Sequence, residues 1–580
     1  MLMAVGVAGA QHGGPHLPPT SVNVALVGKL KLTNVPNGIG DVTARRGFAY
    51  LAGWRPECPS GGVHVVDIRS PSSPQKVAFV SAPEGYYVGE GVHVISPRTS
   101  SFRGDLLLTN HESCPGSAAP RSGGFSLTDV TDPRRPRPLS GLVGDLGSPD
   151  GALRASPNSS HSVQGWVAGR RAYAMLVDNV ERGDDVDIFD ISNPGRVRQI
   201  AEVGLPDWPS ANRRPARGNN AFLHDMQIQR IGGHWLALLS YWDAGWILLN
   251  LDNPARPRLV RDHDFPATER FSGFGPSEGN AHQAFWSSDR KLILGATEDF
   301  NIYRGRLGLS RSGEQFDAYL GGTAGSPLFV ASGQFGPEPL LTVYLGRACT
   351  ATERAPAPQV VAVVERGSCT LEEKAQIAKT AGFVAAVIFN GTGPGQCEAP
   401  AGVFVPSAEI PVYGVARSTG VRILGVPGYQ VAACEAGGGP VLPAPGTAAA
   451  TLTVRAAFDG WGHLSLLDGK TLKTLAHYAV PESRNETYAS GFGTLSVHEV
   501  KTDPRRGVSL GYVSYYGAGA RVVSFTRTGI REVGRFIDEG GNNFWGTFPV
   551  AQGARPPLWL LSDMDYGLYI LRYTGPMRPR

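Results

Sequence analysis

The sequence predicts an all-β protein built from seven similar four-stranded units, with one α/β segment inserted among them. Residues 223–260 form the clearest unit, because an alternating segment, an unbroken apolar run and two further strand-like segments follow one another with tight turns between them. A unit of this kind cannot bury both of its faces alone, so its presence predicts copies. The length of 580 residues, which is too great for one ordinary compact domain, agrees with this interpretation.

The copies open in a similar way, most often with a histidine. The expected first strands begin at Asp41, His93, His161, His224, His282, His498 and Trp545. The histidines are informative because the chain has only 13, and five of them open successive units.

A second signature recurs in the third strands, where an apolar segment ends in Asp or Asn and a proline soon follows. It occurs at 63–74, 125–136, 186–197 and 246–257. The Asp or Asn side chain suits an Asx-type turn, and proline prevents further strand pairing. In these residues the chain resembles the LVIVD-repeat family, over roughly 40–300 and in degenerate form over 456–574. The resemblance implies a β-propeller.

The last unit, which ends near residue 574, lacks a fourth strand of its own. Residues 21–34 alternate apolar and polar side chains in the way needed to supply it. Closing the ring in this way would remove exposed edge strands, which otherwise promote aggregation. We therefore expect a seven-bladed β-propeller closed by an N-terminal strand, with six or eight blades as the alternatives. The blades are expected over 21–305 and 456–580.

The spacing of the first strands places an insertion in the fifth unit, after its second strand. His282 and His498 are 216 residues apart, whereas the earlier units are spaced by 52, 68, 63 and 58 residues. Residues 306–455 fill the gap, and their central part, 360–390, has the pattern of a buried strand, a helix and a second buried strand.

This segment resembles the protease-associated (PA) domain. The matching residues are Arg366, Gly367, Cys369, Lys374, Ala381, Gly382 and Asn390. Leu371 stands where an aromatic residue is commoner. The resemblance implies a lid or a protein-interaction module without catalysis of its own. Because the insert leaves from a second-strand end, on the face that carries the starts of the first strands, we expect it to cover that face.

The six cysteines include no Cys-x-x-Cys pair, which favours disulfides over a thiolate zinc site. Cys58 and Cys114 each follow the second strand of adjacent units, so they are expected to bond to each other. The four cysteines of the insert allow three pairings, of which Cys349–Cys369 together with Cys397–Cys434 is favoured.

The N-terminal region, residues 1–20, has the pattern of a signal-peptide remnant followed by a flexible leader. Its apolar run ends in Ala-Gly-Ala, which resembles a signal cleavage site, and a buried strand is the alternative. No other segment approaches the roughly 18 apolar residues that a membrane span needs. A net charge of +4 without a dense Lys/Arg run gives no footprint for nucleic-acid binding. We expect a secreted, extracellular or periplasmic cell-envelope protein.

Five histidines are candidate metal ligands, because the first strands of a propeller line its central channel. They are His93, His161, His224, His282 and His498. Histidines converging on one axis suit a divalent transition metal, copper or zinc, with calcium less favoured. His161, His224 and His282 are the first choice for one ion, with His93 as a fourth ligand. The alternative is that each histidine only hydrogen-bonds the backbone of a neighbouring blade.

Acidic residues in the second-to-third strand connections are expected on the same face as these histidines. They are Asp178, Asp243, Glu298, Asp299, Asp563 and Asp565. They are candidates for orienting the histidines or for binding calcium, and solvated turn formation is the alternative.

Two functions remain open from the sequence. The first is a non-enzymatic exported scaffold that binds another extracellular or envelope protein through the PA domain or a propeller face. The second is an oxidase-like metalloenzyme that uses the channel histidines under the PA lid, as in the selenium-binding/methanethiol-oxidase propellers, which this chain resembles only in architecture and channel histidines. No protease or hydrolase motif is expected, since His111-Glu112 and His498-Glu499 lack the second histidine of a zinc-binding helix.

Overall fold

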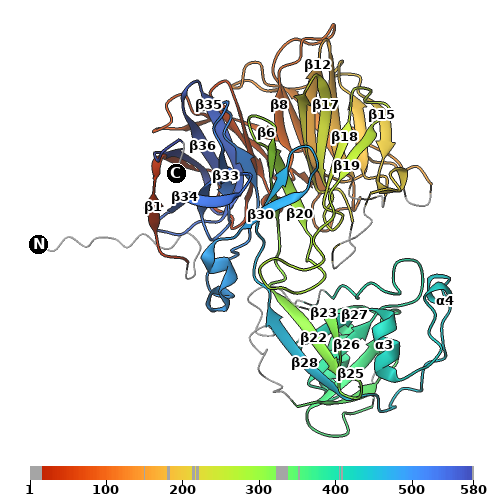
Figure 1. Ribbon diagram of the computed structural model, residues 1–580. Helices are drawn as coiled ribbons and strands as arrows, with labels where there is room; N and C mark the ends of the chain where they lie inside the picture. Colours follow the sequence, from red (N-terminus) through yellow and green to blue (C-terminus); the bar gives the residue numbers. More distant parts are fainter. Residues whose placement is uncertain are drawn as a thin grey trace, which may run out of the picture.

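The computed structural model describes residues 16–148, 151–178, 180, 183–211, 216, 221–321, 338–350, 353–403, 405 and 409–577. Seven antiparallel sheets form the blades of a propeller, and an α/β domain extends from one of them (Figure 1). The innermost strands of neighbouring blades contact one another in a closed ring, from β3 through β8, β12, β16, β20 and β31 to β35 and back to β3. The predicted blade number is therefore confirmed. Of residues 1–20, which were predicted to be a signal-peptide remnant and a flexible leader, 1–15 lie outside the described part of the chain.

The first four blades use strands that are consecutive in the chain. Blade one comprises β3 (Ile39–Arg45), β4 (Phe48–Gly53), β5 (Gly62–Asp67) and β6 (Gln75–Ser81). Blade two comprises β7 (Tyr86–Tyr87), β8 (Val92–Ile95), β9 (Leu106–Ser113), β10 (Gly123–Asp129) and β11 (Arg137–Pro138). Blade three comprises β12 (Ser160–Ala168), β13 (Arg171–Asp178), β14 (Val186–Asp190) and β15 (Arg198–Val203). Blade four comprises β16 (Asp225–Ile231), β17 (His234–Ser240), β18 (Trp246–Asn250) and β19 (Arg258–Asp262).

The last three blades each include strands that are distant in the sequence. Blade five comprises β20 (Ala281–Trp286), β21 (Leu292–Thr297), β29 (Leu464–Asp468) and β30 (Thr474–Tyr478). Blade six comprises β31 (Val500–Thr502), β32 (Leu510–Ser514), β33 (Ala520–Thr526), β34 (Gly529–Ile537) and β1 (Thr20–Val22). Blade seven comprises β35 (Phe544–Gln552), β36 (Arg555–Asp563), β37 (Gly567–Tyr573) and β2 (Val24–Lys31).

The N-terminal closure has the predicted form. Strand β2 pairs antiparallel with β37, with Val24 opposite Tyr573 and Lys31 opposite Gly567. Val24 is buried among residues of blades six and seven. The structure also has a second pairing that was not predicted: β1 adds to the outer edge of blade six through β34. The N-terminal segment therefore ties two blades together.

The blades pack through apolar faces that meet between neighbouring sheets. Between blades four and five, the buried Trp246 packs with Ala284 and Ile293. A Cβ atom on Gly295 would lie 2.4 Å from the ring of Trp246, so glycine is required for this close approach. The unbroken apolar runs of the sequence are therefore strands covered by sheets on both sides.

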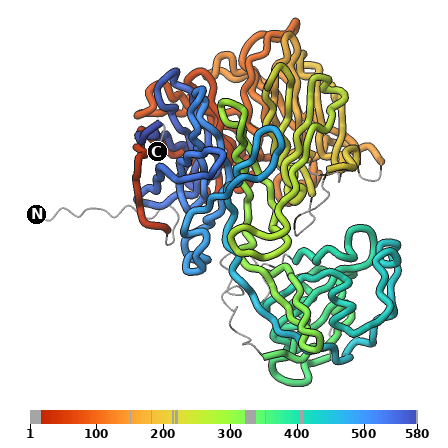
Figure 2. The backbone as a smooth tube through the Cα atoms, in the orientation of Figure 1, coloured from red at the N-terminus to blue at the C-terminus, as the bar shows by residue number. Residues whose placement is uncertain are grey.

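The insert interrupts blade five between β21 and β29, as the sequence predicts. Its seven-stranded sheet follows the order β24–β25–β26–β27–β23–β22–β28. The strands are β22 (Tyr303–Leu309), β23 (Glu314–Leu320), β24 (Leu341–Tyr344), β25 (Val360–Glu365), β26 (Ala385–Phe389), β27 (Val412–Val415) and β28 (Leu452–Phe458). The helices are α2 (Leu371–Thr380), α3 (Arg417–Leu424) and α4 (Val431–Glu435). Figure 2 shows the chain passing from the propeller into this domain and back.

The residues that carry the PA resemblance hold the start of α2 in place. Thr370 caps this helix by accepting a hydrogen bond from the backbone N–H of Glu373, and the Glu373 side chain accepts one from Thr370 N–H. Lys374 is fully buried and donates a hydrogen bond to the carbonyl of Gly367. These contacts give the PA residues a structural role.

All three predicted disulfides are present, namely Cys58–Cys114, Cys349–Cys369 and Cys397–Cys434. The first links blades one and two, and the other two lie in the insert.

Replacing Cys58 and Cys114 by serine is expected to destabilise the propeller by about 4 kcal/mol, because the bond closes a long loop. Tryptophan fluorescence during denaturant unfolding measures this change selectively, since all ten tryptophans lie outside residues 306–455. The matched control is the double serine variant of Cys349 and Cys369, which should leave the tryptophan transition in place. An equal shift in both variants would contradict the prediction.

Candidate functional site

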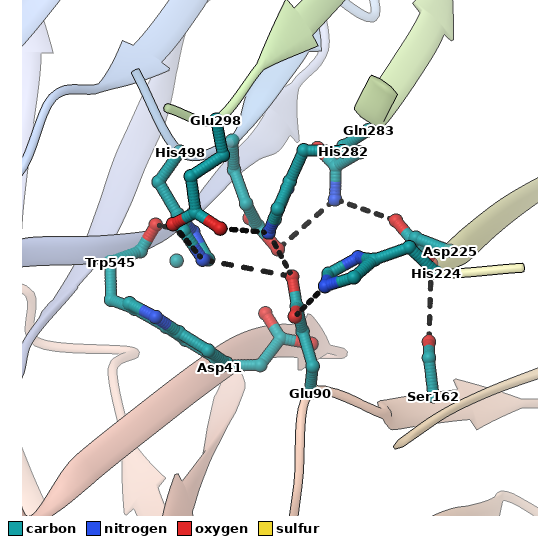
Figure 3. Close-up of polar contacts among 12 residues, drawn as sticks. Asp41, Glu90, Ser162, His224, Asp225, His282, Gln283, Glu298, His498 and Trp545 are labelled. Atoms are coloured by element: carbon teal, nitrogen blue, oxygen red, sulfur yellow. Dashed lines mark hydrogen bonds and ion pairs between the residues drawn. The ribbon is translucent and has the colours of Figure 1, made fainter. Parts of the chain in front are cut away.

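Four histidines and one tryptophan form an arc at the centre of the ring of blades. His161 lies in β12 and His282 in β20, while His224 directly precedes β16 and His498 lies two residues before β31. Ring centroids are 4.5 Å apart between His161 and His224, and 4.2 Å apart both between His224 and His282 and between His282 and His498. Trp545 stacks on His498 at 4.4 Å. The convergence of first-strand histidines predicted from the sequence is therefore present for these four, and Figure 3 labels three of them, His224, His282 and His498.

Glu90 occupies the middle of this arc and was not predicted. Its Oε2 lies 3.0 Å from His161 Nε2 and 3.8 Å from His224 Nε2. Its Oε1 lies 3.4 Å from His282 Nε2 and 3.8 Å from His498 Nε2. The side chain of Glu90 is only 2% exposed. One buried carboxylate thus faces all four histidines, as Figure 3 shows for three of them.

The loop that carries Glu90 lies tightly against blade three. Glu90 N–H donates to the carbonyl of His161, and Gly91 N–H donates to the side chain of Asn110. A Cβ atom on Gly91 would lie 2.3 Å from the backbone nitrogen of Val163, so only glycine fits there. The Gly-Glu-Gly string at 89–91 was the available sequence signal for this residue.

His93, the fifth predicted ligand, does not join the others. Its Nδ1 accepts a hydrogen bond from the backbone N–H of Gly165 at 3.1 Å. It lines a separate cavity of about 130 Å³, together with Asp41, Asp225, Glu499 and Lys501. Burial lowers the pKa of His93 to about 4, so it is neutral. His93 therefore makes the hydrogen bond to a neighbouring blade that the alternative interpretation describes, and it belongs to neither group of possible metal donors.

Further groups fix the orientation of the histidines. His161 Nδ1 lies 3.0 Å from Glu112 Oε1, and Tyr87 donates its hydroxyl hydrogen bond to Glu112 Oε2. His498 Nδ1 donates to the carbonyl oxygen of Trp545 at 2.9 Å, which leaves its Nε2 toward Glu90. Carboxylate and carbonyl partners on the outer ring nitrogen are the usual supports of metal-binding histidines.

Glu298 is the one residue of the predicted acidic set that approaches the histidines. Its Oε2 lies 3.5 Å from His282 Nε2, and its Oε1 lies 3.8 Å from His498 Nε2. Tyr516 donates a hydrogen bond to Glu298. Burial raises the pKa of Glu298 to about 8.

The other acidic residues have local structural contacts. Asp178 accepts hydrogen bonds from Val180 N–H and the Asn158 side chain, and Asp299 accepts one from Asn301 N–H. Asp563 accepts hydrogen bonds from Asn542 and Asn543. Asp243 lies beside the backbone of Asn280, and Asp565 lines the pocket described below.

The pKa shifts favour the neutral imidazole at three of the four histidines, and His161 is the exception. Burial and neighbouring histidines lower the pKa values of His224 and His282 well below the ordinary value. Burial, opposed by its hydrogen bond to Trp545, does the same for His498. Burial would also lower the pKa of His161, but Glu112 and Glu90 raise it above the ordinary value.

The imidazoles of His224 and His282 hydrogen-bond the backbones of His282 and His498, respectively. Two buried atoms that face each other, Glu90 Oε1 and His282 Nε2, have no hydrogen-bond partner among the described residues. Buried polar groups are normally satisfied, so these atoms indicate that something else binds here. Two groups of donor atoms each lie within 4.8 Å of one another, Glu90–His161–His224 and Glu90–His282–His498. Neutral imidazole and carboxylate donors in this arrangement fit a transition metal.

A pocket of about 1010 Å³ opens directly on the four histidines. Its wall includes the large apolar side chains of Trp54, Phe300, Phe492, Trp545 and Met564. The described residues of the insert, 303–458 with their gaps, do not line it. The insert therefore leaves from the predicted face of blade five but does not form the expected lid with the residues that the structure describes.

Two serine motifs require a correction to the expected absence of hydrolase patterns. Residues 275–279 read Gly-Pro-Ser-Glu-Gly and lie in the loop before β20, with no helix after them. Residues 507–511 read Gly-Val-Ser-Leu-Gly, which also matches Gly-x-Ser-x-Gly. This second string leads from a turn into β32, whose strand neighbours are β31 and β33, and no helix follows it. The strand–turn–helix geometry of a nucleophile elbow is therefore missing at both places.

None of the helices in the described ranges is long and apolar enough to cross a membrane. The PA domain family matches residues 339–423. Comparison with curated proteins finds no significant match.

Three solved structures illustrate the similarities of the chain. A zinc aminopeptidase from Bacillus subtilis is 18% identical with a TM-score of 0.17, and the match covers 30% of this chain and 35% of that one, so the chain spans about a third of its length. Sqt1 from Saccharomyces cerevisiae is 9% identical with a TM-score of 0.35, covering 97% and 100%. A protein of unknown function from Dyadobacter fermentans is 10% identical with a TM-score of 0.29, covering 48% and 81%. Similarities at these scores identify no activity. The chain is a seven-bladed β-propeller that carries a PA domain.

Proposed function

We propose that the histidine arc binds a divalent transition metal, copper or zinc, and acts with the pocket above it on a small molecule. The observation that carries this proposal is the convergence of four histidines on the buried Glu90 carboxylate at one end of a pocket of about 1010 Å³, where Glu90 Oε1 and His282 Nε2 lack hydrogen-bond partners among the described residues. Nitrogen donors favour copper or zinc over calcium, which prefers oxygen ligands. His161, His224, His282 and His498 would hold the metal with Glu90.

The chemistry of the site depends on the histidine arc and on the wall of the pocket. A bound transition metal supplies Lewis acidity or, for copper, electron transfer. Glu112 and the Trp545 carbonyl hold the outer nitrogens of His161 and His498, which keeps the inner nitrogens directed at Glu90. The aromatic wall offers an apolar surface to a small substrate, and Asn37 and Asn543 offer polar contacts at its rim.

A binding role for the PA domain is the second part of the proposal. PA domains often serve as protein-interaction modules, and this one extends away from the propeller in Figure 1. We infer that the propeller units are LVIVD-type repeats and that the protein works outside the cytoplasm, where its three disulfides are stable. Its partner would be another extracellular or envelope protein. A scaffold without metal chemistry remains the alternative if the histidine arc binds no ion.

Metal analysis of the purified protein tests the proposal. The wild type should retain at least about one equivalent of copper or zinc per chain, because structural and catalytic sites of this ligand type bind tightly. The double variant His224→Ala/His282→Ala should retain under about a tenth.

The matched control is His93→Asn, because His93 lines the second cavity and not the pocket above the four histidines. Asparagine can accept the hydrogen bond from Gly165 N–H, so this variant should keep the wild-type metal content. Loss of metal from His93→Asn, or a metal-free wild type, would contradict the proposed function.

A further inference from the structure

We propose that Glu90 bridges two metal ions, one held with His161 and His224 and the other with His282, His498 and Glu298. This inference rests on the proposed function of the same site and replaces the single ion expected from the sequence. The two carboxylate oxygens of Glu90 divide the histidines into pairs. Oε2 is the oxygen nearest His161 and His224, and Oε1 is the oxygen nearest His282 and His498.

The first half of the site has the spacing of ligands that share one ion. His161 Nε2 and His224 Nε2 are 3.0 Å apart, and both face Glu90 Oε2. Two nitrogens bound to one zinc at about 2.0–2.1 Å lie roughly 3.4 Å apart in tetrahedral geometry. Glu112 holds the other nitrogen of His161. This half therefore supplies three protein donors and leaves one position toward the pocket.

The second half has its own complete set of donors. His282 Nε2 lies between Glu90 Oε1 at 3.4 Å and Glu298 Oε2 at 3.5 Å. His498 Nε2 is 3.8 Å from Glu90 Oε1 and 3.8 Å from Glu298 Oε1. His282 is 1% exposed, and none of the described groups hydrogen-bonds to its Nε2 or to Glu90 Oε1. The His282 imidazole nitrogen and the Glu90 carboxylate oxygen are both buried, and both lack a hydrogen-bond partner among the described residues. This half is therefore a candidate metal site of its own.

The grouping of donors argues against one ion shared by all four histidines. The donor atoms fall into two groups that have only Glu90 in common. The oxygens of one carboxylate can each bind a different ion, and metals in two-metal sites are about 3.5–4 Å apart. Four neutral histidines and two carboxylates would leave two divalent ions with a net positive charge. An electron-rich oxygen or sulfur ligand in the pocket is therefore the expected third partner.

The test is a copper(II) titration of chelator-stripped protein, with bound metal measured by elemental analysis and the spin count measured by electron paramagnetic resonance. The wild type should bind about two equivalents, with a spin count well below the total copper because carboxylate-bridged ions couple. Each half-site variant, His161→Ala/His224→Ala or His282→Ala/His498→Ala, should bind about one equivalent with a full spin count.

The outcomes distinguish the two-ion bridge at Glu90 from the proposal that the histidine arc binds metal. One equivalent in the wild type overturns the bridge but leaves a metal site in place. Two equivalents with a full spin count also overturn the bridge, since the ions would then lie too far apart. Less than about a tenth of an equivalent defeats both proposals. The wild-type measurements decide the question even if a histidine variant fails to fold, which circular dichroism of each variant would reveal.

Discussion

Truncation of the chain through Lys31 is expected to abolish the stable propeller. The deletion removes β2 and leaves blade seven with three strands. The backbone groups of β37 that pair with β2 then form an open sheet edge. It also removes Val24, which is 2% exposed, from the core between blades six and seven. Loss of the burial of Val24 costs about 2 kcal/mol, which adds to the lost pairing of β37 and is a substantial share of the stability of a folded domain. We expect aggregation or a strongly lowered melting temperature, measured by soluble yield and differential scanning calorimetry.

The matched control is truncation through Asn23, which removes β1 but keeps β2. Strand β1 pairs with β34 over only three residues, and its side chains are partly or largely exposed. This shorter truncation should therefore fold and melt close to the full chain. Equal behaviour of the two truncations would show that β2 does not close the ring.

Replacing Glu90 with glutamine is expected to remove the stabilisation that metal provides without weakening the metal-free protein. Glutamine keeps the shape of the side chain, but its neutral amide is a poor ligand and removes a buried carboxylate that is costly to desolvate. At a metal concentration of about a thousand times Kd, the wild type should gain about 4 kcal/mol over its stripped form. The variant should gain nothing, and its stripped form should unfold within about 1 kcal/mol of the stripped wild type.

Glu112→Gln is the comparison that separates a ligand from a supporting group. Glu112 contacts the outer nitrogen of His161 and not the inner one that faces Glu90. This substitution should weaken metal affinity about 10- to 100-fold and leave binding intact. Denaturant unfolding with and without added copper or zinc measures both variants. A full metal-induced gain in Glu90→Gln would rule out Glu90 as a ligand.

The fold was predictable from the sequence because the same strand pattern repeats along the chain. Apolar runs that end in Asp or Asn before proline repeat at the spacing of one blade, and the break between His282 and His498 marks the insert. The missing fourth strand near residue 574 and the alternating residues 21–34 together required the N-terminal closure. The pairing of β1 with blade six had no comparable signal, since three residues are too few to show a pattern.

The site was predictable only where it lies on these repeated strands. His161, His224, His282 and His498 hold equivalent positions in four blades, and all four reach Glu90. In blade two, the loop before β8 brings Glu90 into that position, and His93 therefore lies deeper, against Gly165. A residue supplied by a loop has no periodic neighbours to reveal it. For the same reason, the direction in which the insert extends could not be derived from the strand order.

Anomalous diffraction from crystals of the purified, copper- or zinc-loaded protein would show whether metal binds beside Glu90. Data collected on both sides of the metal absorption edge locate the ions without reference to any activity. We expect two peaks at the Glu90 carboxylate, one beside His161 and His224 and the other beside His282, His498 and Glu298. A single peak beside Glu90 would leave a metal centre but contradict the bridge. Protein crystallised with metal and showing no peak beside Glu90 would contradict the metal site itself.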